Sequence, residues 1–136
     1  MKYGCKIIVL DHHLCDVKND YAIVINNQLS DYPNKDLSRA GVVWQFCRYL
    51  DKLLKVSNAD NYLDLVALGN CADMMSMTSI ETKHIINKGF QNLKNPFFAS
   101  LAKKNEYSMK NKVNHMSVAF YVAPYVNAIC RSGTIE

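Results

Sequence analysis

The stretch that indicates the fold of this 136-residue chain is Ile7-Ile8-Val9-Leu10-Asp11-His12-His13. Four consecutive apolar residues are typical of a strand that is buried on both faces of a parallel sheet. This strand ends in a carboxylate and two adjacent imidazoles, and open α/β sheets place their binding sites at the carboxyl ends of strands. Imidazole and carboxylate ligands suit a divalent transition metal such as manganese or zinc. The alternative is a surface loop that happens to contain histidine. This alternative is weaker, because two adjacent histidines after an apolar strand have no role in packing. A tripeptide cannot complete a four-ligand site, so the other ligands must come from elsewhere.

The rest of the pattern predicts one more strand and then several helices. A second apolar run, from Tyr21 to Ile25, predicts a neighbouring parallel strand, and Asn26 to Lys35 reads as a loop. Apolar residues recur at helical spacing from Ser38 to Lys55, with Ser38 as the N-cap. Strands followed by helices predict part of an α/β domain.

Three further helix starts are indicated by capping residues. Asp60-Asn61 would cap a helix that carries Leu63 and Val66, and Thr78-Ser79-Ile80-Glu81 has the form of a capping box. Asn95-Pro96 would begin a short helix. Gly89 lies inside the helix that follows the capping box. Glycine makes a helix less stable than alanine does, so its presence there implies a role in packing or function. The stretch from Lys103 to His115 is polar and predicted to be exposed.

Composition places the chain among ordinary globular domains. Hydrophobic residues make up 49% and charged residues 21%, and no apolar stretch is long enough to span a membrane. The amino terminus lacks the features of a signal peptide. Five cysteines without any C-x-x-C pair argue for reduced thiols in a cytoplasmic protein. The net charge is +4, with lysines concentrated between Lys83 and Lys112; this fits an anionic partner such as nucleic acid, although solvated surface lysine is the commoner explanation.

Two residues outside the triplet are candidates for a site. Asp73 is a lone carboxylate at the edge of an apolar segment, which is costly to bury unless it is paired or bound to a metal. The other interpretation of Asp73 is a helix cap or a turn residue. Arg131 lies before Ser132-Gly133, and an arginine in a glycine-containing turn can present its guanidinium to a phosphate. A solvated turn residue is the alternative for Arg131.

Four segments in order resemble the DHH phosphoesterases, and within them the RecJ single-strand-specific exonucleases. Asp11-His12-His13 is similar to the motif that names the family. The others are Tyr32-Pro33 through Val42, the segment from Ala67 to Asp73, and Ala123-Pro124-Tyr125-Val126-Asn127-Ala128-Ile129-Cys130-Arg131. The resemblance covers essentially the whole chain.

The resemblance implies a two-metal site that hydrolyses phosphodiester bonds in single-stranded DNA, with Mn²⁺ or Mg²⁺ as cofactor. His12 and Asp73 would ligate the same ion. His13 would contact the scissile phosphate or assist the leaving group as an acid, and Asp11 would orient an imidazole. Arg131, with Asn127 nearby, would hold a backbone phosphate of the strand. Replication or repair proteins are further partners that the family suggests.

The chain also departs from the family pattern. Tyr125 and Cys130 stand where an arginine and a glycine are common. The family's first two motifs, which supply metal-binding aspartates, and its second domain have no counterpart. Residues 1–136 are therefore expected to be a partial DHH domain, an internal piece that is inactive alone.

Three alternatives stay open. The first is another DHH enzyme: a nano-RNase, a cyclic-dinucleotide phosphodiesterase or a family II pyrophosphatase. Cys71-Ala72-Asp73 is closer to the RecJ pattern than to the Thr-Asp-Thr type of sequence found in those enzymes. The second is a RecJ-like scaffold that has lost its metals, against which the retention of His12, His13 and Asp73 argues. The third is a piece that folds poorly by itself.

Overall fold

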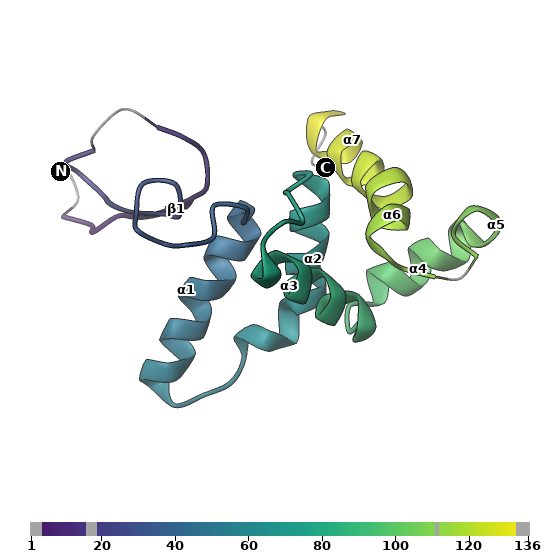
Figure 1. Ribbon diagram of the computed structural model, residues 1–136, viewed down its shortest axis with the longest axis horizontal. Helices are drawn as coiled ribbons and strands as arrows, with labels where there is room; N and C mark the ends of the chain where they lie inside the picture. Colours follow the sequence, from purple (N-terminus) through teal and green to yellow (C-terminus); the bar gives the residue numbers. More distant parts are fainter. Residues whose placement is uncertain (1–3, 16–18, 111, 133–136) are drawn as a thin grey trace.

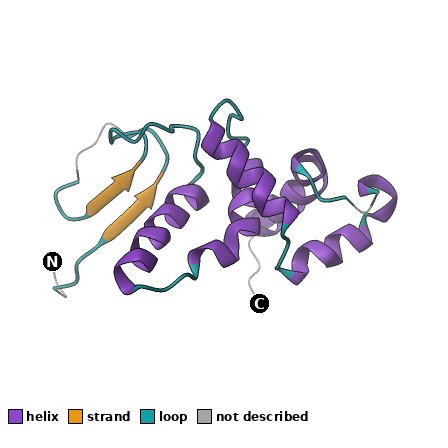
Figure 2. Cartoon of the chain, turned by 60° about the horizontal axis from the view of Figure 1, so that its bottom comes forward, coloured by secondary structure: helices purple, strands orange, loops and turns teal. Residues whose placement is uncertain are grey.

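A computed structural model describes residues 4–15, 19–110 and 112–132. Two short strands come first in these residues and helices follow, which confirms the expected α/β class. The strands lie at one end of an elongated molecule, and the helices extend from them toward the other end (Figures 1 and 2). The elements are β1 (Ile8–Asp11), β2 (Ile23–Asn26), α1 (Arg39–Leu54), the 3₁₀ helix η1 (Ala59–Tyr62), α2 (Leu63–Ala72), α3 (Ile80–Gln91), α4 (Pro96–Lys104), α5 (Glu106–Met109), α6 (His115–Ser117), the π-helix η2 (Val118–Val122) and α7 (Ala123–Ser132).

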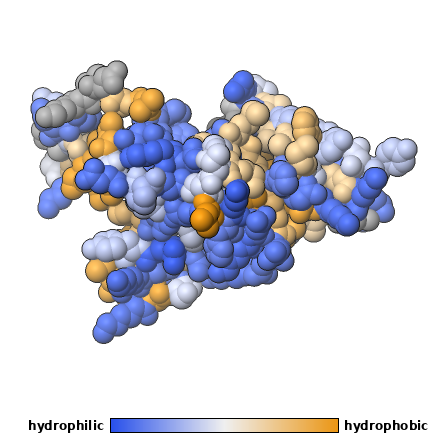
Figure 3. Space-filling view, in the orientation of Figure 1, coloured by the Kyte–Doolittle hydropathy of each residue, from blue (hydrophilic) through white to orange (hydrophobic). Residues whose placement is uncertain are grey.

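The sheet is a parallel pair in which Ile8 lies opposite Ile23 and Asp11 lies opposite Asn26. Helix α1 packs against β1. The strands were expected to be buried, but Ile8 and Ile23 are 51% and 60% exposed in this chain. Hydrophobic side chains are accordingly visible at the end of the molecule that carries the strands (Figure 3). A parallel sheet needs cover on both faces, and one helix against two strands supplies too little of it.

Helix α1 begins as the sequence predicts. The side chain of Ser38 accepts a hydrogen bond from the backbone N–H of Gly41, and Lys55 ends the helix in the left-handed conformation. The N-cap of α4 is also confirmed, because the side chain of Asn95 accepts from the backbone N–H of Phe97.

Two other predicted caps are wrong, because their side chains make tertiary contacts instead. Residues 59–62 form η1, and α2 starts without a side-chain cap; Asp60 accepts a hydrogen bond from the indole of Trp44. Helix α3 starts after Ser79, but no side-chain cap is present there. Glu81 accepts hydrogen bonds from the hydroxyl of Tyr32 at 2.6 Å and from the amide of Asn34 at 2.7 Å. It thereby ties the loop before α1 to α3.

Helices α2 and α3 form the centre of the helical part. Ile85 and Ile86 are buried as predicted, and a second group of apolar side chains extends the core to η2. Gly89 allows the close approach of the two helices: a Cβ placed on it would lie 2.5 Å from the backbone oxygen of Leu63 and 2.7 Å from the Cβ of Ala67. Packing therefore explains why a glycine, which lowers helix stability, is found at position 89.

The carboxyl-terminal part is more helical and less uniformly exposed than expected. The stretch from Lys103 to His115 contains α5, in which Met109 is buried. Arg131 was placed in a glycine-containing turn, but it lies in the last turn of α7; Gly133 lies outside the described residues. Within the residues described, none of the helices is at once long enough and apolar enough to cross a membrane.

Candidate functional site

The carboxyl ends of the two strands bring the first polar groups of the site together. Asp11 is the last residue of β1 and lies opposite Asn26, the last residue of β2. The side-chain amide of Asn26 donates a 2.8 Å hydrogen bond to the backbone oxygen of His13. The strand pairing ends at Asp11 and Asn26, and this side-chain bond holds the backbone of the triplet two residues further, at His13.

His12 and Asp73 lie side by side although 61 positions separate them in the numbering. The Nε2 atom of His12 is 4.0 Å from the Oδ2 atom of Asp73, a distance too long for a hydrogen bond. The His12 side chain is 11% exposed, and its Nδ1 atom is buried without a hydrogen-bond partner among the described residues. Burial lowers the pKa of His12 below its ordinary value of 6.5, so the imidazole is neutral at pH 7.

These features fit a metal ligand pair. Imidazole nitrogen and carboxylate oxygen bind such ions at about 2.0 to 2.2 Å, so two ligands of one ion lie at most about 4 Å apart. A neutral imidazole is the form that ligates, and Nε2 of His12, which faces Asp73 without a hydrogen bond, is the nitrogen that could do so. Within the described part of the chain, however, no group of three or more histidine, cysteine, aspartate or glutamate side chains could hold a metal.

Asp11 and His13 form a second pair on the solvent side of His12. The Nδ1 atom of His13 is 2.9 Å from Oδ1 of Asp11, and the two imidazole rings of the triplet meet edge to face with centroids 4.2 Å apart. Arg39 also reaches Oδ1 of Asp11, from Nε at 3.2 Å and from Nη2 at 3.1 Å. The hydrogen bond from His13, with smaller contributions from the backbone of His12 and from Arg39, lowers the pKa of Asp11 to about 2. Asp11 is therefore an ionised acceptor at neutral pH.

The crossing of α1 and α2 explains how Arg39 and Asp73 reach the triplet. The buried side chain of Asn70 accepts a hydrogen bond from the backbone N–H of Ser38 at 3.0 Å and donates one to the backbone oxygen of Val66 at 3.0 Å. Gly69 lies against Ala40, where an added Cβ would come within 2.6 Å of the alanine Cβ. The first turn of α1 and the last turn of α2 are thus held in contact. Asp73, the C-cap of α2, consequently faces the end of β1 rather than capping α3.

Asn127 and Arg131 are not brought into this group. Both are exposed on α7, which packs against α2. In the described residues, no hydrogen bond or ion pair joins either side chain to Asp73 or to the triplet. Their assignment to a backbone phosphate of the strand therefore stays a prediction.

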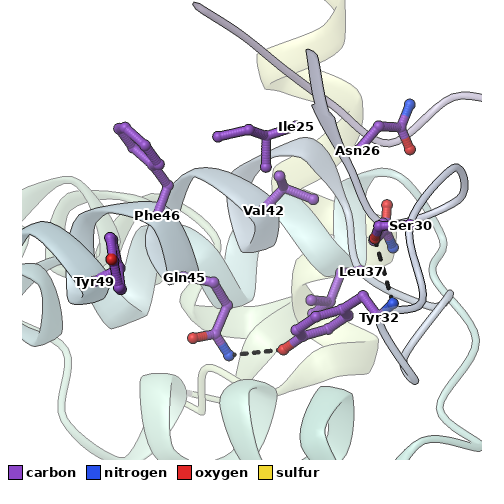
Figure 4. A pocket seen from close by; sticks show the side chains of 10 residues that line it. Ile25, Asn26, Ser30, Tyr32, Leu37, Val42, Gln45, Phe46 and Tyr49 are labelled. Atoms are coloured by element: carbon purple, nitrogen blue, oxygen red, sulfur yellow. Dashed lines mark hydrogen bonds between the residues drawn. The ribbon is translucent and has the colours of Figure 1, made fainter. Parts of the chain in front are cut away.

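An apolar pocket is separate from the His12 and Asp73 pair. It has a volume of about 330 Å³ and lies between β2, α1 and the loop that joins them, with Ile25, Val42, Phe46 and Tyr49 in its wall (Figure 4). Asn26 also lines this pocket, and its side chain is hydrogen-bonded to the backbone of His13. A larger hollow of about 740 Å³ does reach Asp11, on a face of the sheet lined by Val9 and Val24.

Comparison with known proteins gives the chain two relatives. Neither a protein-family model nor a solved structure matches it. It is similar to YorK of Bacillus subtilis (strain 168), named as a candidate single-strand DNA-specific exonuclease derived from the SPbeta prophage. It is equally similar to the YorK protein of Bacillus phage SPbeta, which is named for the same activity. Each relative is 40% identical over an alignment of 136 positions, which covers 99% of this chain but only 24% of the relative's own length. The names of both relatives agree with the exonuclease class that the sequence motifs resemble.

Sequence reasoning missed two residues of the site, Arg39 and Asn26. Arg39 lies within the segment from Tyr32 to Val42 that carries part of the resemblance, but nothing in that segment shows its contact with Asp11. Asn26 follows the second apolar run directly. A polar residue at the end of a second parallel strand is the signal that could have placed it beside the triplet.

Proposed function

We propose that this chain supplies part of the catalytic centre of a metal-dependent exonuclease that hydrolyses phosphodiester bonds in single-stranded DNA. The observation that carries the proposal is the convergence of His12 and Asp73, 4.0 Å apart, beside an Asp11–His13 pair. The names of the two relatives support the substrate and the class of reaction. The whole enzyme would draw its remaining ligands from polypeptide beyond the described residues.

His12 and Asp73 would hold the cofactor, Mn²⁺ or Mg²⁺. When bound, such ions supply an activated water and neutralise charge that develops on the phosphate. The buried and neutral His12 needs no deprotonation to bind the ion through Nε2. Its Nδ1 atom, which has no hydrogen-bond partner here, would take one from outside the described residues. A shared ion would account for a buried imidazole that faces a carboxylate at 4.0 Å without a hydrogen bond.

His13 would act on the phosphate from the solvent side. Its side chain is 63% exposed, and its Nδ1 atom faces the ionised Asp11. Nδ1 therefore donates, which leaves Nε2 directed away from the carboxylate. When protonated, Nε2 can donate to a phosphate oxygen or to the leaving oxygen.

The proposal is tested with a chimera in which the 136 residues replace the matching segment of the Bacillus subtilis relative. We expect the chimera to release nucleotides from single-stranded DNA when Mn²⁺ or Mg²⁺ is supplied, and to leave duplex DNA intact. The isolated 136-residue chain, assayed beside it, should release none, because two ligands do not make a two-metal site. A folded but inactive chimera of an active relative would contradict the proposal, as would manganese-dependent hydrolysis by the isolated chain.

Arg131→Ala in the chimera is expected to weaken binding of single-stranded DNA. The exposed guanidinium in the last turn of α7 can grip one phosphate but cannot ligate a cation. The plot of log affinity against log salt concentration should become shallower by about 0.7, one phosphate contact's worth for a single strand. Manganese affinity should stay the same. Lys52→Ala, in the last turn of α1, removes the same charge elsewhere and serves as control. Equal salt dependence in both variants would show that Arg131 does not touch the strand.

A further inference from the structure

Three nitrogen atoms converge on one oxygen of the triplet. Oδ1 of Asp11 lies 2.9 Å from Nδ1 of His13, 3.2 Å from Nε of Arg39 and 3.1 Å from Nη2 of Arg39. Asp11 and Arg39 come from different elements, the end of β1 and the start of α1. The guanidinium and the imidazole are thus both within hydrogen-bond distance of the same carboxylate oxygen.

The arrangement has a consequence for His13. A neutral imidazole carries one N–H, which can sit on either nitrogen, and a carboxylate oxygen can only accept. With Oδ1 of Asp11 turned toward it, His13 keeps its hydrogen on Nδ1 and its lone pair on Nε2. If the carboxylate rotated away, no described side chain would hold the hydrogen on Nδ1, because the other hydrogen bond to this residue goes to its backbone oxygen.

Arg39 is suited to prevent that rotation. Its two nitrogens grip the same oxygen, and its backbone is fixed because it directly follows the buried N-cap Ser38, which is bound by Asn70. The side chain is 60% exposed and the Asp11 side chain is 26% exposed, so the contact contributes to orientation more than to stability.

We propose that Arg39 is a positioning residue that fixes the carboxylate of Asp11 and, through it, the ring tautomer of His13. The inference rests on the proposed function for the meaning of that tautomer, because it leaves Nε2 as the nitrogen that takes up the proton which is then donated to the phosphate or the leaving group. It goes beyond the resemblance and the relatives, neither of which assigns Arg39 a role.

The test is the side-chain ¹⁵N spectrum of His13 in the 136-residue chain at mildly alkaline pH, where imidazoles are neutral. Long-range proton–nitrogen correlations report which ring nitrogen carries the hydrogen. In the unmodified chain we expect the Nδ1–H form to dominate. In Arg39→Ala the ratio of Nδ1–H to Nε2–H should fall about threefold to tenfold, as expected when a hydrogen bond worth ~1 kcal/mol loses a fixed acceptor.

Two further variants make the result decisive. Arg48→Ala removes another exposed arginine of α1 that contacts Asp60 at 3.7 Å and not the triplet, and it should leave the His13 spectrum unchanged. Arg39→Gln keeps much of the side-chain stem but loses the charge, and it replaces Arg39→Ala if that variant does not fold. An unchanged His13 ratio in a folded Arg39→Ala or Arg39→Gln variant would overturn the inference. The spectrum is recorded without DNA or metal. An unchanged His13 ratio would therefore contradict only the role of Arg39, whereas an inactive chimera would contradict the proposed function.

Discussion

His12→Ala or Asp73→Ala, introduced into the chimera with the Bacillus subtilis relative, is expected to lower the rate of single-strand hydrolysis at least about 10³-fold, or ~4 kcal/mol. The two side chains face each other at 4.0 Å with no hydrogen bond between them, so each variant would remove one of two ligands of the same ion. Calorimetric titration should show weaker Mn²⁺ binding in both variants. Nucleotide release under saturating substrate gives the rate.

A matched control for these variants is His84→Ala. His84 is an exposed histidine on α3, outside the group that includes the triplet and Asp73. It should retain the activity of the unmodified chimera. If His12→Ala kept full activity and manganese affinity in a folded chimera, the metal assignment would be wrong and the buried imidazole would be a core residue.

Gly89→Ala is expected to destabilise the chain by about 3 kcal/mol. The added methyl group would meet the backbone oxygen of Leu63 at 2.5 Å and the Cβ of Ala67 at 2.7 Å, and neither atom can swing aside as the end of a long side chain can. The helices α2 and α3 would have to separate where Gly89 lies against Leu63 and Ala67. Urea denaturation should show a lower midpoint with an unchanged slope.

Gly41→Ala is the control for this substitution because it makes the same change in another buried helical glycine. Its Cβ would lie 2.9 Å from Cδ2 of Leu37, a flexible side-chain atom that can move. The gain in helix propensity of about 1 kcal/mol offsets part of that contact. Equal stability of the Gly89→Ala and Gly41→Ala variants would mean that the helix pair adjusts without cost.

Local signals predicted the elements whose causes lie within a few residues. The apolar runs before Asp11 and near Ile25 are strands, and Ser38 and Asn95 cap their helices. In each case the deciding interaction is backbone pairing or a hydrogen bond two or three residues away. The caps that failed, at Asp60 and at Thr78 to Glu81, have the same local pattern. There the side chains bind distant partners, Trp44 for Asp60 and Tyr32 for Glu81, and a local rule does not contain those partners.

The residue types and their order predict the chemistry of this protein: an apolar strand that ends in Asp11, His12 and His13, with a lone carboxylate at Asp73. Which of these groups meet follows from the packing of the helices. Gly69 and Asn70 hold the end of α2 against the start of α1, and this contact turns Asp73 toward His12 and brings Arg39 to Asp11. Residue types and local spacing set what each group can bind. The contacts between distant groups follow from how closely two helices can approach, and that distance is set by packing across the whole core.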